Sequence, residues 1–177
     1  LLTLSGHAGG LFDLAYSPDG TRLGTASGDG TTRAWNAVTG KELLTLRGHT
    51  DEVWGIAFNS DGTRLATGSL DRTVAIWDAA SGEELTRLAG FSDWVLDVAF
   101  SPDGARLATA EKGGRVRVWE TSTGRELFAL SGHADEVFSV VFSPFDGGKR
   151  LATASADGTA RIWNVSLTRE LLTLPIS

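Results

Sequence analysis

The 177-residue sequence has no cysteine and no methionine, and it holds only four prolines and one tyrosine. Without cysteine, the chain forms no disulfides and no thiolate metal sites. It also lacks a long apolar run and any stretch that looks like a signal sequence, which argues against a membrane-spanning helix. We therefore expect a soluble, cytoplasmic protein with no membrane partner.

Basic residues are also scarce. The chain has 16 lysines and arginines against 22 acidic residues, a net charge of −6, and the two signs are interspersed. Because nucleic-acid binding through phosphate neutralisation normally leaves a basic patch, this composition argues against a nucleic-acid partner.

The chief feature that is present is a repeat. Residues 48–78, GHTDEVWGIAFNSDGTRLATGSLDRTVAIWD, have edited copies along the whole chain. Equivalent leucines recur at offsets of 42, 42, 42 and 44 residues, at Leu1, Leu43, Leu85, Leu127 and Leu171. A longer hairpin in the fourth repeat, residues 143–149, accounts for the larger offset. Units of this length contact mainly their neighbours, so they stack into one array.

Each repeat predicts four antiparallel strands. In the second repeat, runs of apolar and β-branched residues are separated by turn clusters such as Asn59-Ser60-Asp61-Gly62 and Ser81-Gly82. The chain is thus predicted to be all-β, a single segment over residues 1–177. A lone four-stranded sheet leaves two faces to bury, so the units must stack around a common axis. The predicted units span residues 11–46, 53–88, 95–130 and 137–174, with an extra outer strand at residues 1–4.

The repeat length, the Gly-His pair near its start and the Trp77-Asp78 pair at its end resemble the WD-repeat family of β-propellers. The resemblance covers essentially the whole chain and implies a propeller segment with four blades per chain, each a four-stranded antiparallel sheet. Family members usually close with seven or eight blades. Four blades therefore close unusually tightly, remain half of a ring, or pair with a second chain.

We favour pairing, because two chains of four blades complete an eight-bladed ring and bury both end faces. The expected partner is then a second copy of the chain, in a homodimer. Residues 1–4 would lie on the last blade of the partner, in competition with residues 171–174. The sequence also begins inside the repeat pattern and without methionine, so we expect a fragment of a longer protein.

Three repeats carry the same four polar residues at matching offsets. Serine, histidine and aspartate are also the components of a hydrolase triad, but three copies in one chain argue against catalysis. The resemblance implies instead a structural tetrad in each blade, in which Asp orients His, His bonds Ser, and Ser accepts the indole N–H. We therefore expect no enzymatic activity and no catalytic residues. The tetrads are His7, Ser27, Asp29 and Trp35; His49, Ser69, Asp71 and Trp77; and His133, Ser155, Asp157 and Trp163.

The third repeat lacks this set. Phe91, Glu111 and Gly113 stand where His, Ser and Asp are expected, and only Trp119 remains. Loss of all three polar members together is what a buried relay predicts, because half of a polar network costs more than none. One interpretation is drift in a redundant repeat. The other is that this blade bends its loops for binding and brings Glu111 and Lys112 to the rim.

Large apolar residues where the chain leads into each first strand predict a partner-binding surface. The resemblance places these loops on the narrower face of the propeller, near its axis. Their side chains either pack between blades or form a hot spot with carboxylates beside it. The shared position holds Phe12, Trp54, Leu96 and Phe138, while Trp94 replaces Glu52 and Glu136. The partner-binding candidates are Phe12, Trp54, Leu70, Trp94, Lys112 and Phe138.

The resulting prediction is a non-enzymatic protein–protein interaction scaffold within a larger signalling or regulatory protein. The alternative is a small-ligand or glycan-binding propeller with aromatic platforms between blades. The three histidines lie one per repeat, and the paired glycines at 113–114 and 147–148 sit in turns and not between a strand and a helix. We therefore expect no metal site, no phosphate-binding loop and no cofactor.

Overall fold

The computed structural model describes residues 2–166 and 169–175, and these residues form sixteen β-strands and no helix. The strands make four sheets, which we call blades 1 to 4 in chain order. Every blade has four antiparallel strands, arranged in the order in which the chain forms them. The predicted all-β architecture of four-stranded blades is confirmed.

The strand bounds are regular along the chain. Blades 1 and 2 contain β1 (Leu11–Tyr16), β2 (Arg22–Ser27), β3 (Thr31–Asn36), β4 (Glu42–Arg47), β5 (Val53–Phe58), β6 (Arg64–Ser69), β7 (Val74–Asp78) and β8 (Glu84–Leu88). Blades 3 and 4 contain β9 (Val95–Phe100), β10 (Arg106–Glu111), β11 (Val116–Glu120), β12 (Arg125–Leu130), β13 (Val137–Phe142), β14 (Arg150–Ser155), β15 (Thr159–Asn164) and β16 (Arg169–Pro175).

Turn chemistry ends the strands where the sequence predicts. Between β1 and β2, Asp19 Oδ1 accepts hydrogen bonds from Ser17 Oγ at 2.6 Å and from Thr21 N at 3.0 Å. The turns between the second and third strands need a left-handed residue, and three blades place glycine there. Blade 2 instead holds Arg72 at a φ of 63°, a conformation that costs an ordinary residue some backbone strain.

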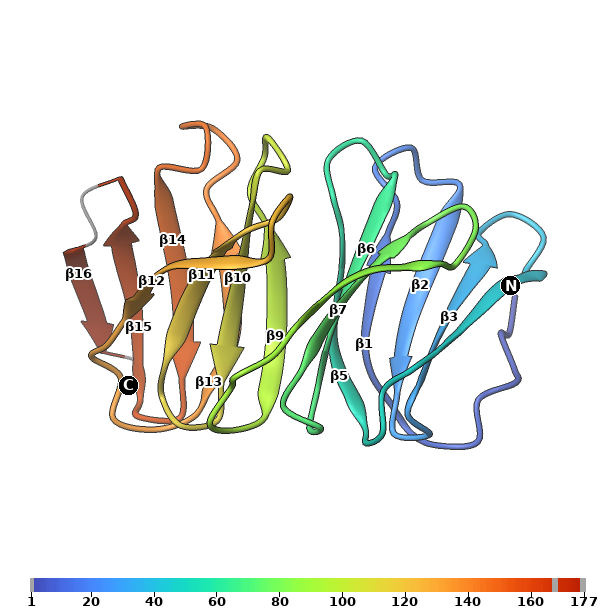
Figure 1. Cartoon of the computed structure of the whole chain (residues 1–177), viewed down its shortest axis with the longest axis horizontal. Helices are drawn as coiled ribbons and strands as arrows, with labels where there is room; N and C mark the ends of the chain where they lie inside the picture. Colours follow the sequence, from blue (N-terminus) through green and yellow to red (C-terminus); the bar gives the residue numbers. More distant parts are fainter. Residues whose placement is uncertain (1, 167–168, 176–177) are drawn as a thin grey trace.

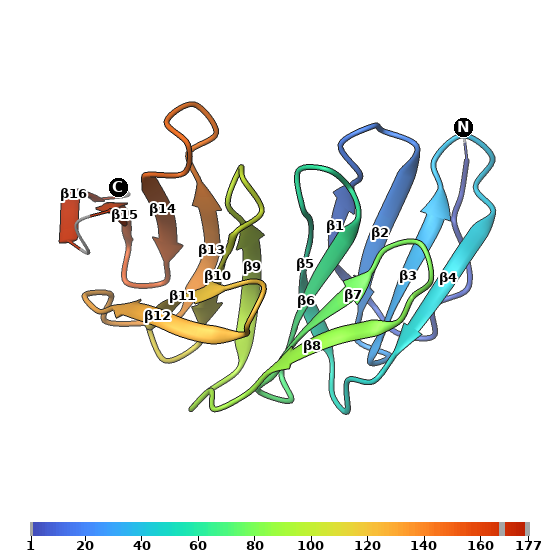
Figure 2. The same cartoon turned by 45° about the horizontal axis from the view of Figure 1, so that its top comes forward.

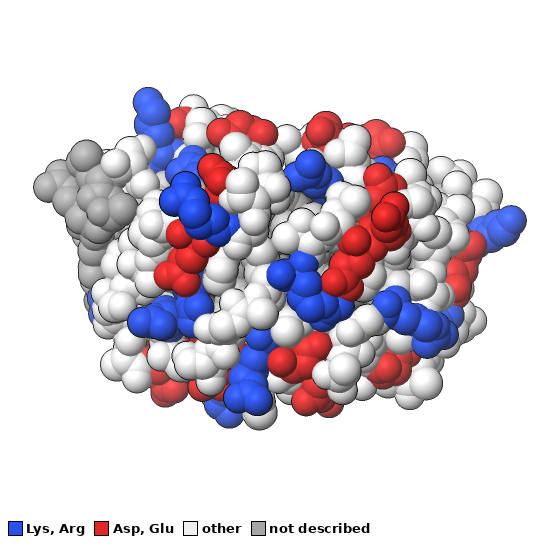
Figure 3. Space-filling model, in the orientation of Figure 1, with Lys and Arg blue, Asp and Glu red and all other residues white. Residues whose placement is uncertain are grey.

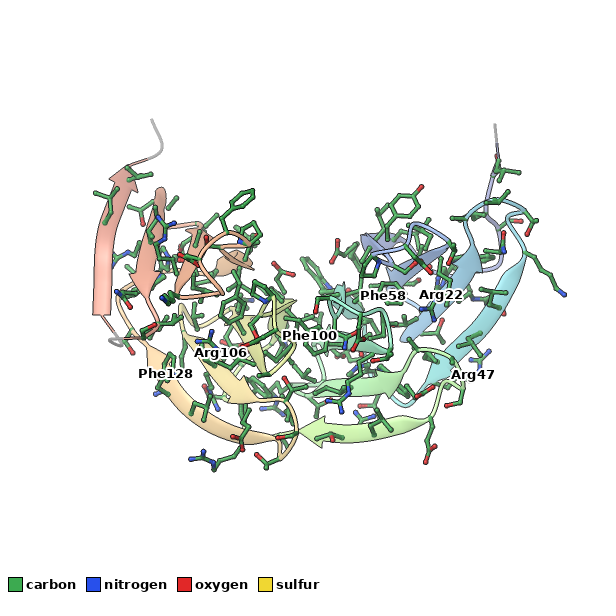
Figure 4. The ribbon with its side chains drawn as sticks, turned by 90° about the horizontal axis from the view of Figure 1, so that it is seen from above. Arg22, Arg47, Phe58, Phe100, Arg106 and Phe128 are labelled. Atoms are coloured by element: carbon green, nitrogen blue, oxygen red, sulfur yellow. The ribbon has the colours of Figure 1, made fainter. Side chains whose placement is uncertain are left out.

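The hydrophobic core lies between neighbouring blades, in three layers that we call seams 1–2, 2–3 and 3–4. In each seam the second strand of one blade contributes alanine, and the first strand of the next blade contributes larger side chains. In seam 1–2, Ala26 of β2 packs in the same cluster as Ile56 and Trp77 of blade 2. The guanidinium of Arg22 also lies over the ring of Phe58, 5.4 Å from its centre (Figure 4). Each blade therefore needs a neighbour on both sides to bury its two faces.

The four blades stand side by side and form an open arc. Figures 1 and 2 show them in chain order, with blade 1 at one end and blade 4 at the other. Seen from above, the arc opens on one side, and its two end blades do not meet (Figure 4). The first strands β1, β5, β9 and β13 contact one another in sequence, so they line the inner side of the arc.

The extra outer strand expected at residues 1–4 forms no ladder in a single chain. Residues 2–4 have no strand pairing, and Leu1 lies outside the described residues. Leu4 nevertheless packs near Gly40, its Cδ2 atom 3.3 Å from where a Cβ would sit. Leu46 of β4 lies in the same way beside Gly82, at 3.0 Å. Residues 2–4 thus occupy the place, relative to blade 1, that an outer strand of a preceding blade takes.

Candidate functional site

A hydrogen-bonded relay crosses blades 1, 2 and 4, but its hydroxyl belongs to threonine and not to serine. In blade 2, His49 Nδ1 lies 2.9 Å from Asp71 Oδ2, and His49 Nε2 lies 2.8 Å from Thr67 Oγ1. Trp77 Nε1 donates to the same Oγ1 atom at 2.9 Å. The matching relays are His7, Asp29, Thr25 and Trp35, and His133, Asp157, Thr153 and Trp163.

The predicted assignment of Ser27, Ser69 and Ser155 to these relays is wrong. Trp77 pairs with Leu65 across the strands, so its indole reaches diagonally to Thr67, two residues along β6. Ser69 lies two residues farther on, at the end of the strand, where its Oγ accepts from Asp71 N at 3.0 Å. The serines therefore cap the turn that carries the aspartate. Threonine recurs at this position in every repeat, at Thr25, Thr67, Thr109 and Thr153, which is the signal that sequence reasoning overlooked.

The direction of the relay follows from its chemistry. A carboxylate only accepts, so His49 Nδ1 donates to Asp71, and Nε2 accepts from the Thr67 hydroxyl. Burial raises the pKa of Asp71, but hydrogen bonds from His49, Thr73 and Thr50 outweigh it and hold that pKa well below its usual range. The side chains of His49 and Asp71 are only 2% and 6% exposed, so no substrate reaches them. This geometry supports a structural role.

Blade 3 replaces the relay with a buried ion pair. Glu111 Oε1 lies 2.8 Å from Arg117 Nε, and the two side chains are 0% and 5% exposed. Arg117 also donates to Gly90 O at 3.1 Å, and its guanidinium lies 4.9 Å from the centre of the Phe91 ring. Burial raises the pKa of Glu111, and the neighbouring Arg117 opposes that shift. The prediction that this blade brings Glu111 to the rim is therefore wrong, because its carboxylate points into the blade.

Four β-bulges bring together side chains from all four blades. In blade 1, Leu11 pairs with Ser27 and Asp13 pairs with Ala26, so Phe12 is an extra, unpaired residue. The same irregularity occurs at one position in each of the other first strands. A bulge re-aims the side chain of its extra residue. The bulged residues are Phe12, Trp54, Leu96 and Phe138, and with Asp13, Asp97 and Ser139 they line a depression of about 260 Å³, which we call the axial pocket.

Aromatic rings form one wall of the axial pocket. Phe12 stacks on Trp54, with ring centres 4.5 Å apart and planes 15° from parallel. Trp54 Nε1 donates to Glu52 Oε2 at 3.0 Å, which holds the indole in place. Phe12 and Phe138 remain 43% and 49% exposed, although both are large apolar residues. The pocket therefore presents fixed aromatic edges to solvent.

Two aspartates at the base of the axial pocket also tie the blades together. Asp13 Oδ2 accepts from Ile56 N at 3.0 Å, across seam 1–2. Asp97 Oδ2 accepts from Val140 N at 2.8 Å, across seam 3–4. Burial raises the pKa of both carboxyls, and that of Asp97 reaches about 6 although its backbone N–H partners oppose the shift. Sequence reasoning did not single out these aspartates.

A second cluster of candidates lies beside the axial pocket, at the seam between blades 3 and 4. Lys112 Nζ lies 3.9 Å from the centre of the Trp94 ring and 3.6 Å from Glu136 Oε1. We call these three residues the Trp94 cluster. Leu70 is half-buried, and its N–H donates to Glu52 O at 3.0 Å. The candidates thus divide into Phe12, Trp54 and Phe138 in the pocket, Trp94 and Lys112 in the cluster, and Leu70 in a turn of blade 2.

Figure 3 shows acidic and basic side chains interspersed over the face in view, with neither sign forming a continuous patch. Residues 2–166 and 169–175 contain no group of three or more His, Asp or Glu side chains that could hold a metal ion. None of these residues belongs to a helix long and apolar enough to cross a membrane.

The stacked four-stranded antiparallel sheets, each buried against its neighbours, define the chain as a set of β-propeller blades. The family described as WD domain, G-beta repeat (WD40) matches residues 1–36, 40–78, 82–120 and 124–164. These matches cover most of the sequence, and the chain belongs to this family. No curated protein matches the chain.

The family repeats are displaced from the structural blades. The match over residues 40–78 begins at β4 of blade 1 and continues through β5, β6 and β7 of blade 2. Each repeat therefore crosses a seam and links two blades covalently. The first match begins at residue 1, so residues 2–4 correspond in sequence to the outer strand of a blade that would precede blade 1.

Proposed function

We propose that this chain is a non-enzymatic protein–protein interaction scaffold within a larger signalling or regulatory protein. WD40 repeats generally mediate protein–protein interaction or scaffolding. The observation that carries the proposal is the axial pocket, where four bulges present large apolar side chains around one depression. Fixed, solvent-exposed aromatic residues are the usual anchors of protein interfaces.

The surroundings of the pocket favour a partner segment with an apolar anchor and a basic flank. Glu52 lies beside Trp54, and Asp13 and Asp97 line the same depression. Opposite charge on the partner speeds association and fixes its orientation, while the aromatic contacts supply most of the affinity. The Trp94 cluster extends this surface across seam 3–4, so that a segment longer than the pocket has a second contact.

The arrangement gives less support to a small-ligand or glycan-binding propeller. That function needs an aromatic platform repeated in each blade. Phe12 and Trp54 instead stack on each other, and blade 3 holds Leu96 at the equivalent position. The four bulged side chains thus form one shared surface, which suits a single extended partner.

We further propose that the chain pairs with a second copy in a homodimer that completes an eight-bladed ring. The open arc supports this, because an unclosed row of blades leaves its two end faces uncovered, whereas a closed ring covers both (Figure 4). Within such a ring, the axial pockets of both copies face the same central space.

The interaction proposal is tested with peptides selected on the wild-type protein from a displayed random library. The selected peptides are then titrated against three variants, Trp54→Ala, Trp94→Ala and Phe145→Ala, by fluorescence anisotropy. Phe145 is the matched control, since it is 95% exposed on the β13–β14 hairpin, away from the pocket. We expect at least tenfold weaker binding to Trp54→Ala, a smaller loss with Trp94→Ala, and unchanged binding to Phe145→Ala.

Circular dichroism and the melting temperature serve as folding controls for each variant. Peptides that bind all three variants as tightly as they bind the wild type place recognition elsewhere and refute the role of the axial pocket.

A further inference from the structure

Blade 1 leaves uncovered a face that the other three blades bury. Leu11, Leu14 and Tyr16 of β1 are 54%, 58% and 61% exposed. The residues at the same repeat positions in blade 2 are Val53, Ile56 and Phe58, and Val53 and Ile56 are 0% and 4% exposed. This outward face also carries a groove of about 590 Å³, bordered by Leu2, Leu4, Leu11, Leu14 and Leu23 among others. Blade 1 thus presents the large-residue half of a seam.

Blade 4 presents the opposite half. Val141 of β13 is 55% exposed, whereas Ala57 and Ala99 at the same repeat position pack against the cores of seams 2–3 and 3–4. A groove of about 230 Å³ lies on this blade, bordered by Val141, Arg150, Ala152 and Ile162 among others. The equivalents of Ala152 in blades 2 and 3, Ala66 and Ala108, are 0% exposed in their seams. Blade 4 therefore leaves exposed the face that blades 1 to 3 pack against the next blade.

The two uncovered faces also carry the residues of an arginine contact that crosses seams 1–2 and 3–4. In seam 1–2, Arg22 donates to Gly62 O at 2.6 Å, and in seam 3–4, Arg106 donates to Gly148 O at 2.8 Å. Arg150 holds the same repeat position in blade 4, and the described residues form no blade beyond it. It bonds instead to Asp146 in its own hairpin, with Nε 2.6 Å from Oδ2, and stays 52% exposed. Blade 4 thus carries the arginine that would reach across a seam to another blade.

The seams also alternate, with a period of two blades. Asp13 and Asp97 each reach across a seam to a backbone N–H, in seams 1–2 and 3–4. Between them, seam 2–3 has Gly55 at this position, packed against the backbone of Asp97. Blade 4 carries the small residue Ser139, which would face Asp13 of a following blade. A contact between blade 4 and another copy of blade 1 would continue this alternation.

We propose that blade 4 of one copy packs head to tail on blade 1 of a second copy, and that the reverse contact closes the ring. This rests on the homodimer proposed above and assigns its interface. Both new seams bury Leu14 and Tyr16 of one copy against Val141 and Ala152 of the other, and Arg150 lies beside Tyr16 of the partner subunit. Two identical contacts related by a twofold axis give a closed assembly with no free end.

The head-to-tail arrangement also gives residues 2–4 a neighbour. They already lie beside Gly40 as an outer strand of a preceding blade lies beside the next. In the closed ring, that preceding blade is blade 4 of the partner, whose fourth position is held by β16. A blade has one position for an outer strand, so residues 2–4 of one copy and β16 of the other compete for pairing with β15 of that other copy.

The test uses single cysteine variants, because the wild-type chain has no cysteine to interfere. Tyr16→Cys and Arg150→Cys are made in separate chains, mixed after mild unfolding, refolded together and treated with a short bis-maleimide crosslinker. The head-to-tail seam predicts covalent dimers in the mixture and none with either variant alone, since equal positions of the two copies lie at different seams. Ser122→Cys, at an exposed turn of blade 3 and so on neither end blade, is mixed with Arg150→Cys as the control.

Light scattering on the wild type separates the possible failures. A dimer that crosslinks as predicted supports the assignment. A dimer in which Tyr16→Cys crosslinks to itself overturns the head-to-tail seam but leaves the homodimer intact. A mass near 18.7 kDa at all concentrations overturns both the seam and the homodimer, while peptide binding at the axial pocket still decides the interaction function.

Discussion

At the scale of single residues, the relay threonines connect the folding of a blade to its core. Thr67 is fully buried, and its hydroxyl is hydrogen-bonded to both Trp77 and His49. When this hydroxyl is removed, His49 Nε2 and Trp77 Nε1 lose their shared hydrogen-bond partner. Leaving buried polar groups unpaired is energetically costly. Blade 3 has the same tryptophan and threonine without the histidine, which provides an internal comparison.

Replacing Thr67 by valine should lower the free energy of unfolding by about 1–3 kcal/mol. Thr109→Val should cost less, because only Trp119 Nε1 uses that hydroxyl, at 3.1 Å. Urea denaturation of the two variants measures the difference, and Thr67→Ser, which keeps the hydroxyl, should recover most of the loss. Equal losses in Thr67→Val and Thr109→Val would show that the histidine adds nothing to the relay.

Asp97 should make stability fall between pH 4 and pH 7. Burial raises its pKa from 3.8 to about 6, so the folded state retains a proton that the unfolded chain has released. This contribution is fully present below pH 3.8 and is lost as the pH rises through about 6. The shift corresponds to about 3 kcal/mol.

The measurement compares the wild type with Asp97→Asn, whose amide does not titrate. The stability advantage of the wild type should shrink by about this amount from pH 4 to pH 7. Asp61→Asn is the control, since hydrogen bonds from Thr63 lower the pKa of Asp61 and confine its effect to more acidic solutions. A constant difference between wild type and Asp97→Asn over this range contradicts the buried, raised carboxyl.

At the scale of strands, blade 3 holds a different polar interaction from the one that the other three blades share. Adjacent strands β10 and β11 carry Glu111 and Arg117, whose contact replaces the Asp-His-Thr relay. A buried ion pair adds little net stability, because desolvation offsets the attraction, but a single buried charge is strongly unfavourable. The pair therefore ties β10 to β11 as long as both partners are present.

Arg117→Met should reduce the free energy of unfolding by about 3–5 kcal/mol, because it leaves Glu111 buried without its partner. The double variant Glu111→Met/Arg117→Met should be markedly more stable than either single variant. Arg125→Met provides the surface comparison, since Arg125 and Glu120 form an exposed pair at 3.9 Å, and its loss should cost less than about 1 kcal/mol. Additive losses in the double variant would mean that the two side chains act independently.

At the scale of the whole molecule, the end faces make stability depend on association. A partner that binds only the folded state raises the melting temperature, and the rise grows with the logarithm of the partner's concentration. The wild type should therefore melt at higher temperature as its concentration increases. Leu14→Arg, which places a charge on the outward face of blade 1, should melt lower and show no such dependence.

Ser122→Arg is the control for that experiment, because Ser122 is exposed in a turn of blade 3, which is not an end blade. It should keep the concentration dependence of the wild type. A wild-type melting temperature that does not change with concentration contradicts a seam formed between copies.

Much of the fold was predictable because it depends on local patterns. Turn clusters, alternating apolar residues and a repeat of fixed length specify four-stranded blades, and family membership agrees with that prediction. The placement of Phe12, Trp54 and Phe138 on one surface also followed from their shared repeat position. What local patterns do not contain is the register of one strand against another, and the errors arose there.

The amino-acid sequence by itself determined the blades, their number and order, and the equivalence of the repeats. These features depend only on the spacing of residues that are close together in the sequence. Only the tertiary structure decided that Thr67 and not Ser69 completes the relay, since this depends on which residues lie diagonally across β6 and β7. It also decided that Glu111 is buried against Arg117, and that bulges turn the four aromatic and aliphatic side chains toward one pocket. These features depend on contacts between strands and between blades, which no single repeat contains.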